Sequence, residues 1–227
     1  MMSFPLILTL YVGFTHAFET DHLLAVGNIV LGRSNIKMSL KDGVAWGLGH
    51  TTTILLVGML LLLFRINIAE HYFRYLEASV GLMLVLLGFY RLSKLLKENK
   101  IVLHSHTHQH SIRDAHTHLH IHVRELEEHR HPHKLAYGVG LVHGLAGSGA
   151  LILMVMAQIN EPVMGLMYLF IFGMGSVGGM LLAAGLFSLP FSKKLLHSEI
   201  VQVILITVSG ILCVGYGTWV VYQNLIA

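Results

Sequence analysis

The chain is poor in cysteine and in charged residues. Cys213 is the only cysteine among 227 residues, which excludes an intramolecular disulfide, a thiolate metal cluster and a redox pair within this sequence. We expect it to be a small buried apolar residue in the last helix. Only 12% of the residues are charged, whereas 54% are hydrophobic. This composition is far from that of a soluble globular protein and predicts a membrane protein.

Motifs of several enzyme classes are also missing. No His-Glu-x-x-His run occurs, which excludes a zincin protease, and no Walker A run occurs. The run Ala146-Gly147-Ser148-Gly149 lacks the first glycine of an intramembrane serine protease motif, and the last apolar span has no histidine to act as a base. An intramembrane protease is therefore a remote alternative. We expect a protein that is not an enzyme.

The positive charge of the chain does not indicate nucleic acid as a partner. The formal net charge is +3 and the pI is about 9.0, but the basic residues fall between the apolar spans and no recognition motif accompanies them. The N-terminal MMSFPLILTLY lacks the basic region of a signal peptide. We therefore expect the first segment to stay in the mature protein and the lipid bilayer to be the chain's large partner.

The hydrophobic pattern predicts an all-α polytopic membrane protein with six transmembrane helices. Each apolar span is about 20 residues long, enough for a helix to cross a bilayer. Trp46, Tyr72, Tyr90, Tyr137, Trp219 and Tyr222 lie near the ends of these spans and are expected as interfacial anchors. The spans are residues 4–27, 43–64, 73–92, 135–157, 163–188 and 200–222.

The distribution of Lys and Arg predicts the orientation. If the N-terminus lies outside, only Arg65 and Arg74 fall in outer loops and every other Lys and Arg falls in a cytoplasmic loop. This is a strong positive-inside bias. We expect a multi-pass protein of the bacterial inner membrane with both termini outside.

Four ionisable residues interrupt the first apolar span. They are His16, Glu19, Asp21 and His22, and an ionisable side chain near the middle of a bilayer costs roughly 2.5 to 3.5 kcal/mol on insertion scales. In an unbroken helix, with His16 at zero, Asp21 would lie near 140 degrees and His22 near 240 degrees around the axis. A shared cation would therefore need a distorted turn between His16 and His22, which we predict. The alternative is hydrogen bonding to neighbouring helices.

The residues of this segment resemble a known signature. The run HAFETDHL, from His16 to Leu23, is similar to the selectivity element of the nickel/cobalt transporter family, which reads His, four residues, Asp, His. Gly49-His50-Thr51-Thr52 resembles a second element of that family. The run from His143 to Gly149, HGLAGSG, resembles its short six-helix branch, which includes the urease-accessory nickel transporters. Acidic elements found in the later helices of longer members are absent here.

This resemblance implies transport of Ni²⁺, with Co²⁺ as a second candidate substrate, and no prosthetic group. Uptake that supplies urease or hydrogenase is favoured over efflux, with cytoplasmic nickel chaperones as candidate partners; energy coupling and oligomeric state stay open. Nitrogen donors with one carboxylate suit a late transition metal better than Mg²⁺ or Ca²⁺. His50 could ligate the metal or orient Asp21, and Thr51, Thr52 and Ser148 are expected to support helix contacts. The expected metal-site residues are His16, Glu19, Asp21, His22, His50 and His143.

The two halves of the chain look like one three-helix unit repeated. Residues 12–16 align with 139–143, and residues 79–81 with 208–210. Because each unit has an odd number of spans, the copies would run in opposite directions, as in many secondary transporters. The expected division is therefore a first repeat at 1–92, a loop at 93–134 and a second repeat at 135–227, with His16 and His143 approaching one another. Glycine pairs such as Gly173 and Gly175 are expected to allow close helix contact.

The middle segment, residues 93–134, is rich in histidine. Two runs alternate histidine with other residues, so an extended chain would present each run as a row of imidazoles, and residues 111–114 between them would permit a hairpin. We expect a cytoplasmic metal buffer, with an inert polar linker as the alternative. A membrane-bound sensor or chaperone that used this loop alone would leave the cluster at His16 to His22 unexplained. The buffer candidates are His104, His106, His108, His110, His116, His118, His120 and His122.

Overall fold

Four long apolar helices form the body of the protein. The computed structural model describes residues 3–31, 35–64, 70–97, 102–109, 115–122, 132–146, 161–191 and 199–227. Within these ranges, four helices are long and apolar enough to cross a membrane. They are α3 (Ile36–Phe64), α4 (Glu70–Lys97), α7 (Pro162–Ser188), which continues into the short 3₁₀ helix η1 (Leu189–Phe191), and α8 (Glu199–Leu225).

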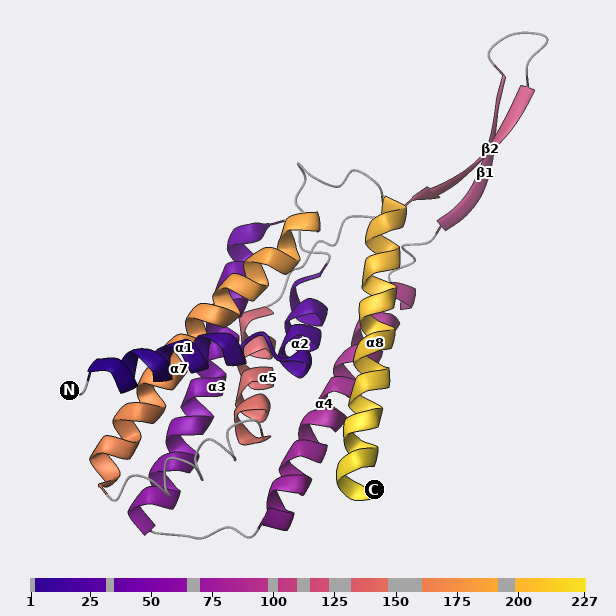
Figure 1. Cartoon of the computed structure of the whole chain (residues 1–227). Helices are drawn as coiled ribbons and strands as arrows, with labels where there is room; N and C mark the ends of the chain where they lie inside the picture. The colour runs from indigo at the N-terminus through magenta and orange to yellow at the C-terminus, as the bar shows by residue number, and fades with distance from the viewer. Residues whose placement is uncertain are drawn as a thin grey trace.

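The long helices pack in two pairs that combine the two halves of the chain. Helix α3 lies against α7, and α4 lies against α8 (Figure 1). The shorter helix α5 (Pro132–Ala146) packs on α3, while the N-terminal helix α1 (Ser3–His16) packs on α7. Elements far apart in the sequence therefore meet at every major helix contact.

Glycines permit these contacts. A Cβ atom added at Gly140 would collide with the Trp46 carbonyl oxygen, and one added at Gly13 would collide with that of Phe172. On the other helix pair, a Cβ at Gly81 would lie 2.7 Å from the Gly217 carbonyl oxygen. Such distances leave no room for a side chain, so the glycines allow close helix approach as predicted.

The first apolar span, residues 4–27, was expected as one helix and is two. Helix α1 ends at His16, and α2 runs over Thr20–Val30 in a different direction (Figure 1). Tight i to i−3 hydrogen bonds join them, from the Phe18 N–H to the Thr15 carbonyl at 2.9 Å and from the Glu19 N–H to the His16 carbonyl at 3.1 Å. The predicted distortion between His16 and His22 is thus confirmed, and it is large enough to end the helix.

Other boundaries also differ from expectation. Helix α3 begins at Ile36 instead of residue 43, so Trp46 lies more than two turns inside the helix and is 0% exposed. Its assignment as an interfacial anchor is therefore wrong. Helix α4 extends to Lys97, past the expected end at residue 92. The expected span 135–157 is described only as far as Ala146, and its remainder lies outside the described residues.

Part of the histidine-rich segment forms a two-stranded antiparallel sheet. Strand β1 (Val102–Gln109) pairs with β2 (Ala115–His122), and His106 is the Cα partner of His118. The hairpin expected from the two alternating runs is therefore present in the backbone. The connecting residues 111–114 lie outside the described residues, as do the side chains of both strands.

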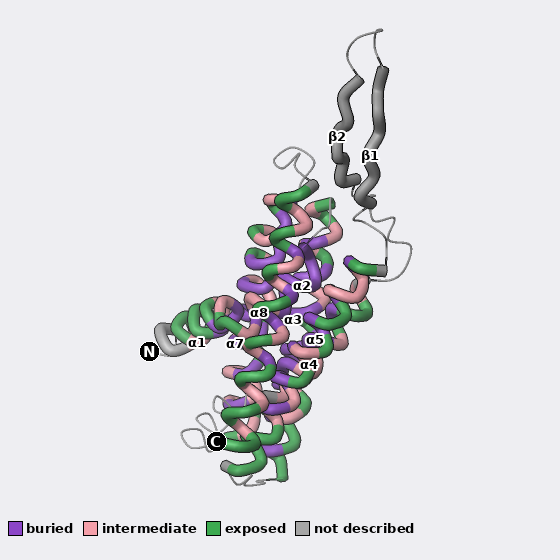
Figure 2. The backbone as a smooth tube through the Cα atoms, turned by 90° about the vertical axis from the view of Figure 1, so that its right-hand side faces the viewer, coloured by how far each residue is buried: buried purple, intermediate pink, exposed green. Residues whose placement is uncertain are grey.

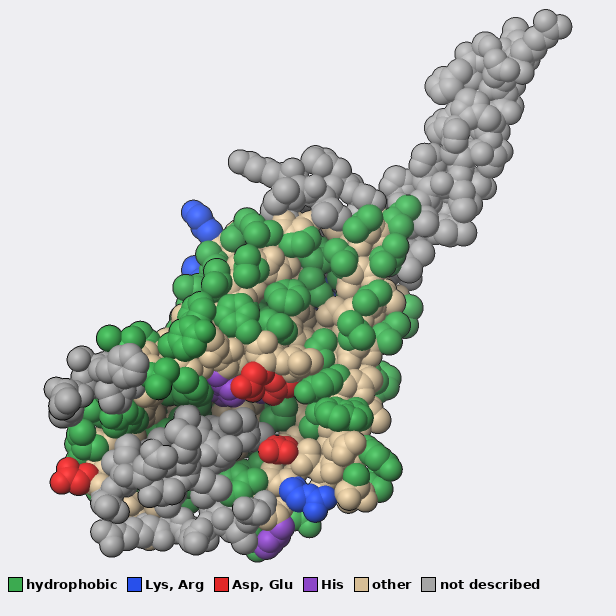
Figure 3. All heavy atoms as spheres, viewed as in Figure 1, with side chains coloured by type: hydrophobic (Ala, Val, Ile, Leu, Met, Phe, Trp, Pro, Cys, Tyr) green, Lys and Arg blue, Asp and Glu red, His purple; other side chains and the backbone are tan. Residues whose placement is uncertain are grey.

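Apolar side chains also cover the outside of the molecule. Buried residues lie mainly on helix faces that meet one another, and α1 projects sideways from the other helices and is largely exposed (Figure 2). Hydrophobic side chains dominate the face drawn in Figure 3. Leu86 on α4 and Ile211 on α8 are 61% and 57% exposed. Such a surface fits contact with lipid tails.

Candidate metal centre

The break between α1 and α2 brings two histidines together. His16 is the last residue of α1 and His22 lies in the first turn of α2. Because Glu19 is extended, with φ −64° and ψ 154°, the chain turns back and the two ring centroids lie 4.5 Å apart. An unbroken helix would have pointed these rings to different sides.

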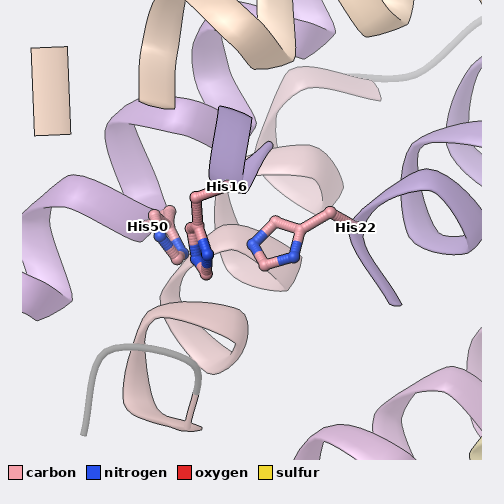
Figure 4. Close-up of side chains that lie close together, drawn as sticks. All are labelled: His16, His22 and His50. Atoms are coloured by element: carbon pink, nitrogen blue, oxygen red, sulfur yellow. The ribbon is translucent and has the colours of Figure 1, made fainter. Parts of the chain in front are cut away.

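A third histidine, His50, comes from the middle of α3. Its ring centroid lies 5.4 Å from that of His16 and 5.2 Å from that of His22. One nitrogen from each of the three rings lies within 4.8 Å of the others. His22 and His50 are 0% exposed and His16 is 8% exposed. The three rings face a common point (Figure 4), so they form one buried group of nitrogen donors, here called the histidine cluster.

Several nitrogens of the histidine cluster have no hydrogen-bond partner among the residues that the structure describes. They are Nε2 of His16, Nε2 of His22 and both ring nitrogens of His50. Burying an unpaired polar group is unfavourable, and nearly all buried polar groups in native proteins have a partner. A cation held between the rings would be a partner for all three side chains at once.

Glu19 orients His16 within the histidine cluster. Nδ1 of His16 lies 2.8 Å from Oε1 of Glu19. Since a carboxylate only accepts hydrogen bonds, Nδ1 must carry the hydrogen and donate it. Nε2 of His16 is then the nitrogen with a free lone pair, and it is the buried nitrogen without a partner. This carboxylate–histidine pairing is typical of metal sites.

Asp21 holds two further imidazoles, one with each oxygen. Its Oδ1 accepts from the backbone N–H of His22 at 2.9 Å and from Nδ1 of His22 at 3.0 Å. Its Oδ2 accepts from Nε2 of His143, on α5, at 3.1 Å. Asp21, His22 and His143 make a second group whose donor atoms lie within 4.8 Å of one another. The two groups share His22.

Aromatic rings close the site on two sides. Trp46 lies 5.5 Å from the His22 ring and 5.8 Å from the His143 ring, and Phe172 lies 5.3 Å from the His16 ring, all between centroids. Sequence reasoning missed both residues. The available signal was the run from Trp46 to His50, in which two glycines separate the tryptophan from the histidine, as glycines do where helices approach closely.

The threonines near His50 bind backbone carbonyls. Thr51 donates to the Gly173 carbonyl on α7 at 3.1 Å, and Thr53 donates to the Leu141 carbonyl on α5 at 2.9 Å. Thr52 donates to the Leu48 carbonyl within its own helix at 2.7 Å. Thr52 also accepts a hydrogen bond from the Tyr137 hydroxyl of α5 at 3.4 Å. Thr51 and Thr52 therefore both support helix contacts, as expected. Ser148 lies outside the described residues.

All six residues expected at the metal site meet at one place. His50 joins the rings of His16 and His22, while it is His143 that bonds to Asp21. His16 and His143, which were expected to approach one another, are both neighbours of the His22 ring, with centroid distances of 4.5 Å and 4.3 Å. The side chains of the eight buffer candidates in the loop lie outside the described residues.

Two comparisons identify relatives of the chain. The profile of the family described as cytochrome C biogenesis protein transmembrane region matches residues 22–219. The urease accessory protein UreH of Bacillus sp. (strain TB-90) is 35% identical over 196 residues, which cover 85% of this chain and 81% of that protein. No solved structure matches. Neither description is that of an enzyme, and the expectation that the chain is not an enzyme is confirmed.

Proposed function

The chain belongs to the cytochrome C biogenesis transmembrane-region family and to the family of UreH, and on this premise we propose that it imports Ni²⁺ across a membrane. The observation that carries the proposal is the histidine cluster. His16, His22 and His50 offer at least one unpartnered buried nitrogen each, within a bundle whose outer surface is apolar. A buried group of this kind inside membrane helices marks an ion path.

The charges around the histidine cluster match a divalent ion. Carboxylates close to a buried dication stabilise it, because they offset its charge. Glu19 bonds to His16 and Asp21 bonds to His22, and these two carboxylates would balance the charge. The arrangement therefore favours a divalent over a monovalent ion.

The chemistry of the donors favours a late transition metal, and the relatives favour nickel. Imidazole suits Ni²⁺, Co²⁺, Cu²⁺ and Zn²⁺, whereas Mg²⁺ and Ca²⁺ prefer oxygen donors. The matched relative is an accessory protein of urease, which is a nickel enzyme, and the His16–His22 motif resembles that of the nickel/cobalt transporters. We take Ni²⁺ as the main substrate and Co²⁺ as the second.

Reciprocal contacts support the inverted repeat and a rocking mechanism. Gly13 of α1 approaches the Phe172 carbonyl of α7, and Gly140 of α5 approaches the Trp46 carbonyl of α3. These are equivalent contacts if residues 12–16 correspond to 139–143. We propose that the repeats 1–92 and 135–227 move against each other around the metal centre, which opens it alternately to the two sides of the membrane.

The location of the protein, its orientation and the role of the hairpin are proposed from the sequence. We propose that the protein lies in the bacterial inner membrane with both termini outside, because all Lys and Arg except Arg65 and Arg74 then fall on the cytoplasmic side. The hairpin of β1 and β2 would lie in the cytoplasm and act there as a metal buffer, from which chaperones could receive nickel.

Dithiol chemistry is the function least compatible with this chain. Thiol–disulfide exchange between two cysteines of one chain needs a pair, and these 227 residues contain Cys213 alone. Its side chain is 0% exposed. Membership of a cytochrome c biogenesis family therefore supports a shared helical scaffold for this chain, but it does not support a redox role.

The test is accumulation of radioactive ⁶³Ni²⁺ by cells that express the wild type or Asp21→Ala at matched membrane levels, with Co²⁺ and Zn²⁺ as competitors. We expect accumulation to rise with the wild type only, and Co²⁺ to compete better than Zn²⁺. Lower accumulation than in cells without the protein would establish efflux instead. Equal accumulation in all cells would refute transport of nickel.

A further inference from the structure

A large cavity lies beside the metal centre. Its volume is about 910 Å³, and it opens between the α1–α2 break, α4 and α8. Glu19 and Asp21 line it from the break, and Glu77 lines it from α4. Among the described residues that line it, none is Lys or Arg. On the face drawn in Figure 3, acidic side chains lie beside a histidine, and hydrophobic side chains lie nearby.

The cavity lies toward one end of the helix bundle. Helices α4 and α8 run antiparallel, since Gly81 contacts Gly217 and Gly88 contacts Gly210. The lining residues of α8 run from Tyr216 to Asn224, near its C-terminal end, and those of α4 lie near its start. This is the end that carries the C-terminus, and α4 continues toward β1 from the opposite end.

Two carboxylates that bond to the metal centre form part of the cavity wall. Asp21 lines the cavity and bonds to both His22 and His143, while Glu19 lines it and bonds to His16. The carboxylates bond to Nδ1 of His16 and of His22, and Nε2 of each ring is buried without a hydrogen-bond partner among the described residues. The side chains of Glu19 and Asp21 therefore connect the cavity wall to the histidines, although no described histidine lines the cavity itself.

Of the carboxylates that line the cavity, Glu77 is the one on α4, toward the outer end of the cavity. Val80 and Glu77 line the cavity from one face of α4, a single turn apart, and Glu77 is the nearer to the start of the helix. The Glu77 side chain is exposed, and Gln223 and Asn224 line the same region from α8. Carboxylate and amide oxygens suit an ion that still carries its water shell.

From these observations we propose that the cavity is the entry path for the hydrated divalent ion, and that Glu77 is an ion-binding residue at its outer part. The proposal rests on the proposed function and extends it by naming the side of entry and a residue outside the histidine motif. The ion passes from water to Glu77, then to Asp21 and His143, and then to the histidine cluster. Because the two groups at the centre share His22, the last transfer needs only a short movement.

The first test measures the initial rate of ⁶³Ni²⁺ uptake against nickel concentration for Glu77→Gln, Glu77→Asp and Glu161→Gln. Glu161 is a matched control because it is exposed, precedes α7 and does not line the cavity. Loss of one carboxylate near a dication in water should raise the half-saturating nickel concentration about three- to tenfold. We expect this for Glu77→Gln, with an unchanged maximal rate, and wild-type behaviour for the other two variants.

The second test asks which side of the membrane the cavity faces. In a Cys213→Ala background, single cysteines are placed at Thr20, which lines the cavity, and at Gln202, at the opposite end of α8. A membrane-impermeant thiol reagent added to intact cells should label Thr20→Cys and not Gln202→Cys. Ni²⁺ should slow the labelling of Thr20→Cys, and Mg²⁺ at the same concentration should have less effect.

The outcomes separate the entry path from the proposed function. If the wild type accumulates nickel while Glu77→Gln has the wild-type half-saturating concentration, the role of Glu77 is refuted and transport stands. Labelling of Gln202→Cys without Thr20→Cys would mean that the cavity faces the cytoplasm, which overturns entry through it. Absence of nickel accumulation by the wild type would overturn the transport function and the path together.

Discussion

Asp21 and His143 are joined by a hydrogen bond that ties the first half of the chain to the second. Oδ2 of Asp21 accepts from Nε2 of His143 at 3.1 Å, across 122 positions of sequence. The other oxygen of Asp21 holds His22. One carboxylate therefore sets the position of an imidazole on α2 and of another on α5. Any motion of the first half of the chain against the second must break this bond or move both of its residues together.

This bond predicts non-additive effects of two substitutions. Asp21→Asn and His143→Gln should each lower nickel affinity, by about 10- to 100-fold if the carboxylate mainly orients the rings. The double variant should bind nickel only slightly more weakly than the single variant with the lower affinity, because each change removes the same interaction. The measurement is nickel binding by purified protein in detergent. Fully additive losses would mean that the two residues act separately.

His50 should be needed for nickel binding, because its ring completes the histidine cluster and both its nitrogens lack a partner. His50→Gln should abolish the tight site. The control is His71→Gln, since His71 is exposed on α4 and far from the site in sequence. Loop histidines would bind nickel in the same assay, so the eight from His104 to His122 are first replaced by serine. Unchanged affinity in His50→Gln would remove His50 from the site.

Two glycines of α5 should respond differently to the same substitution. A Cβ added at Gly140 would collide with the Trp46 carbonyl oxygen and would lie 3.0 Å from the backbone nitrogen of His50. A Cβ added at Gly138 would have no heavy atom within 4 Å. Gly140→Ala should therefore destabilise the protein by about 1 to 3 kcal/mol. Gly138→Ala should leave stability equal or slightly higher, because alanine favours the helix. Thermal unfolding in detergent is the measurement, and equal Tm values would contradict close α3–α5 packing.

The sequence allowed the long spans and the break after His16 to be predicted, but not the packing between helices. Apolar length identifies α3, α4, α7 and α8, and four ionisable residues in seven positions indicate a distortion. A membrane helix is apolar on all sides, however, so periodicity does not tell which face is buried. The boundary of a span is likewise not fixed by apolar length: Trp46 was expected at the membrane interface because the span was expected to begin at residue 43, whereas α3 begins at Ile36 and Trp46 is 0% exposed beside His22.

The sequence likewise does not determine which histidine of the site bonds to Asp21. The sequence does not decide whether His50 ligates the metal or orients Asp21, because the answer depends on how far α3 lies from the α1–α2 break. In the structure His143 bonds to Asp21, and His50 lies beside the rings of His16 and His22. Contacts between residues more than 100 positions apart arise from helix packing, which spacing along one helix does not report.

Cys213 offers a last prediction, which separates transport from thiol chemistry. Its Sγ–H donates to the Leu84 carbonyl oxygen at 3.3 Å between α8 and α4, and the side chain is 0% exposed, so it serves packing. Cys213→Ala should accumulate ⁶³Ni²⁺ at the wild-type rate, and Cys213→Ser should do the same if it folds to the same level. An impermeant thiol reagent should leave wild-type accumulation unchanged, because the buried sulfur is out of its reach. Loss of accumulation in Cys213→Ala at an unchanged membrane level would instead assign the thiol a direct role in transport and would contradict its assignment to packing.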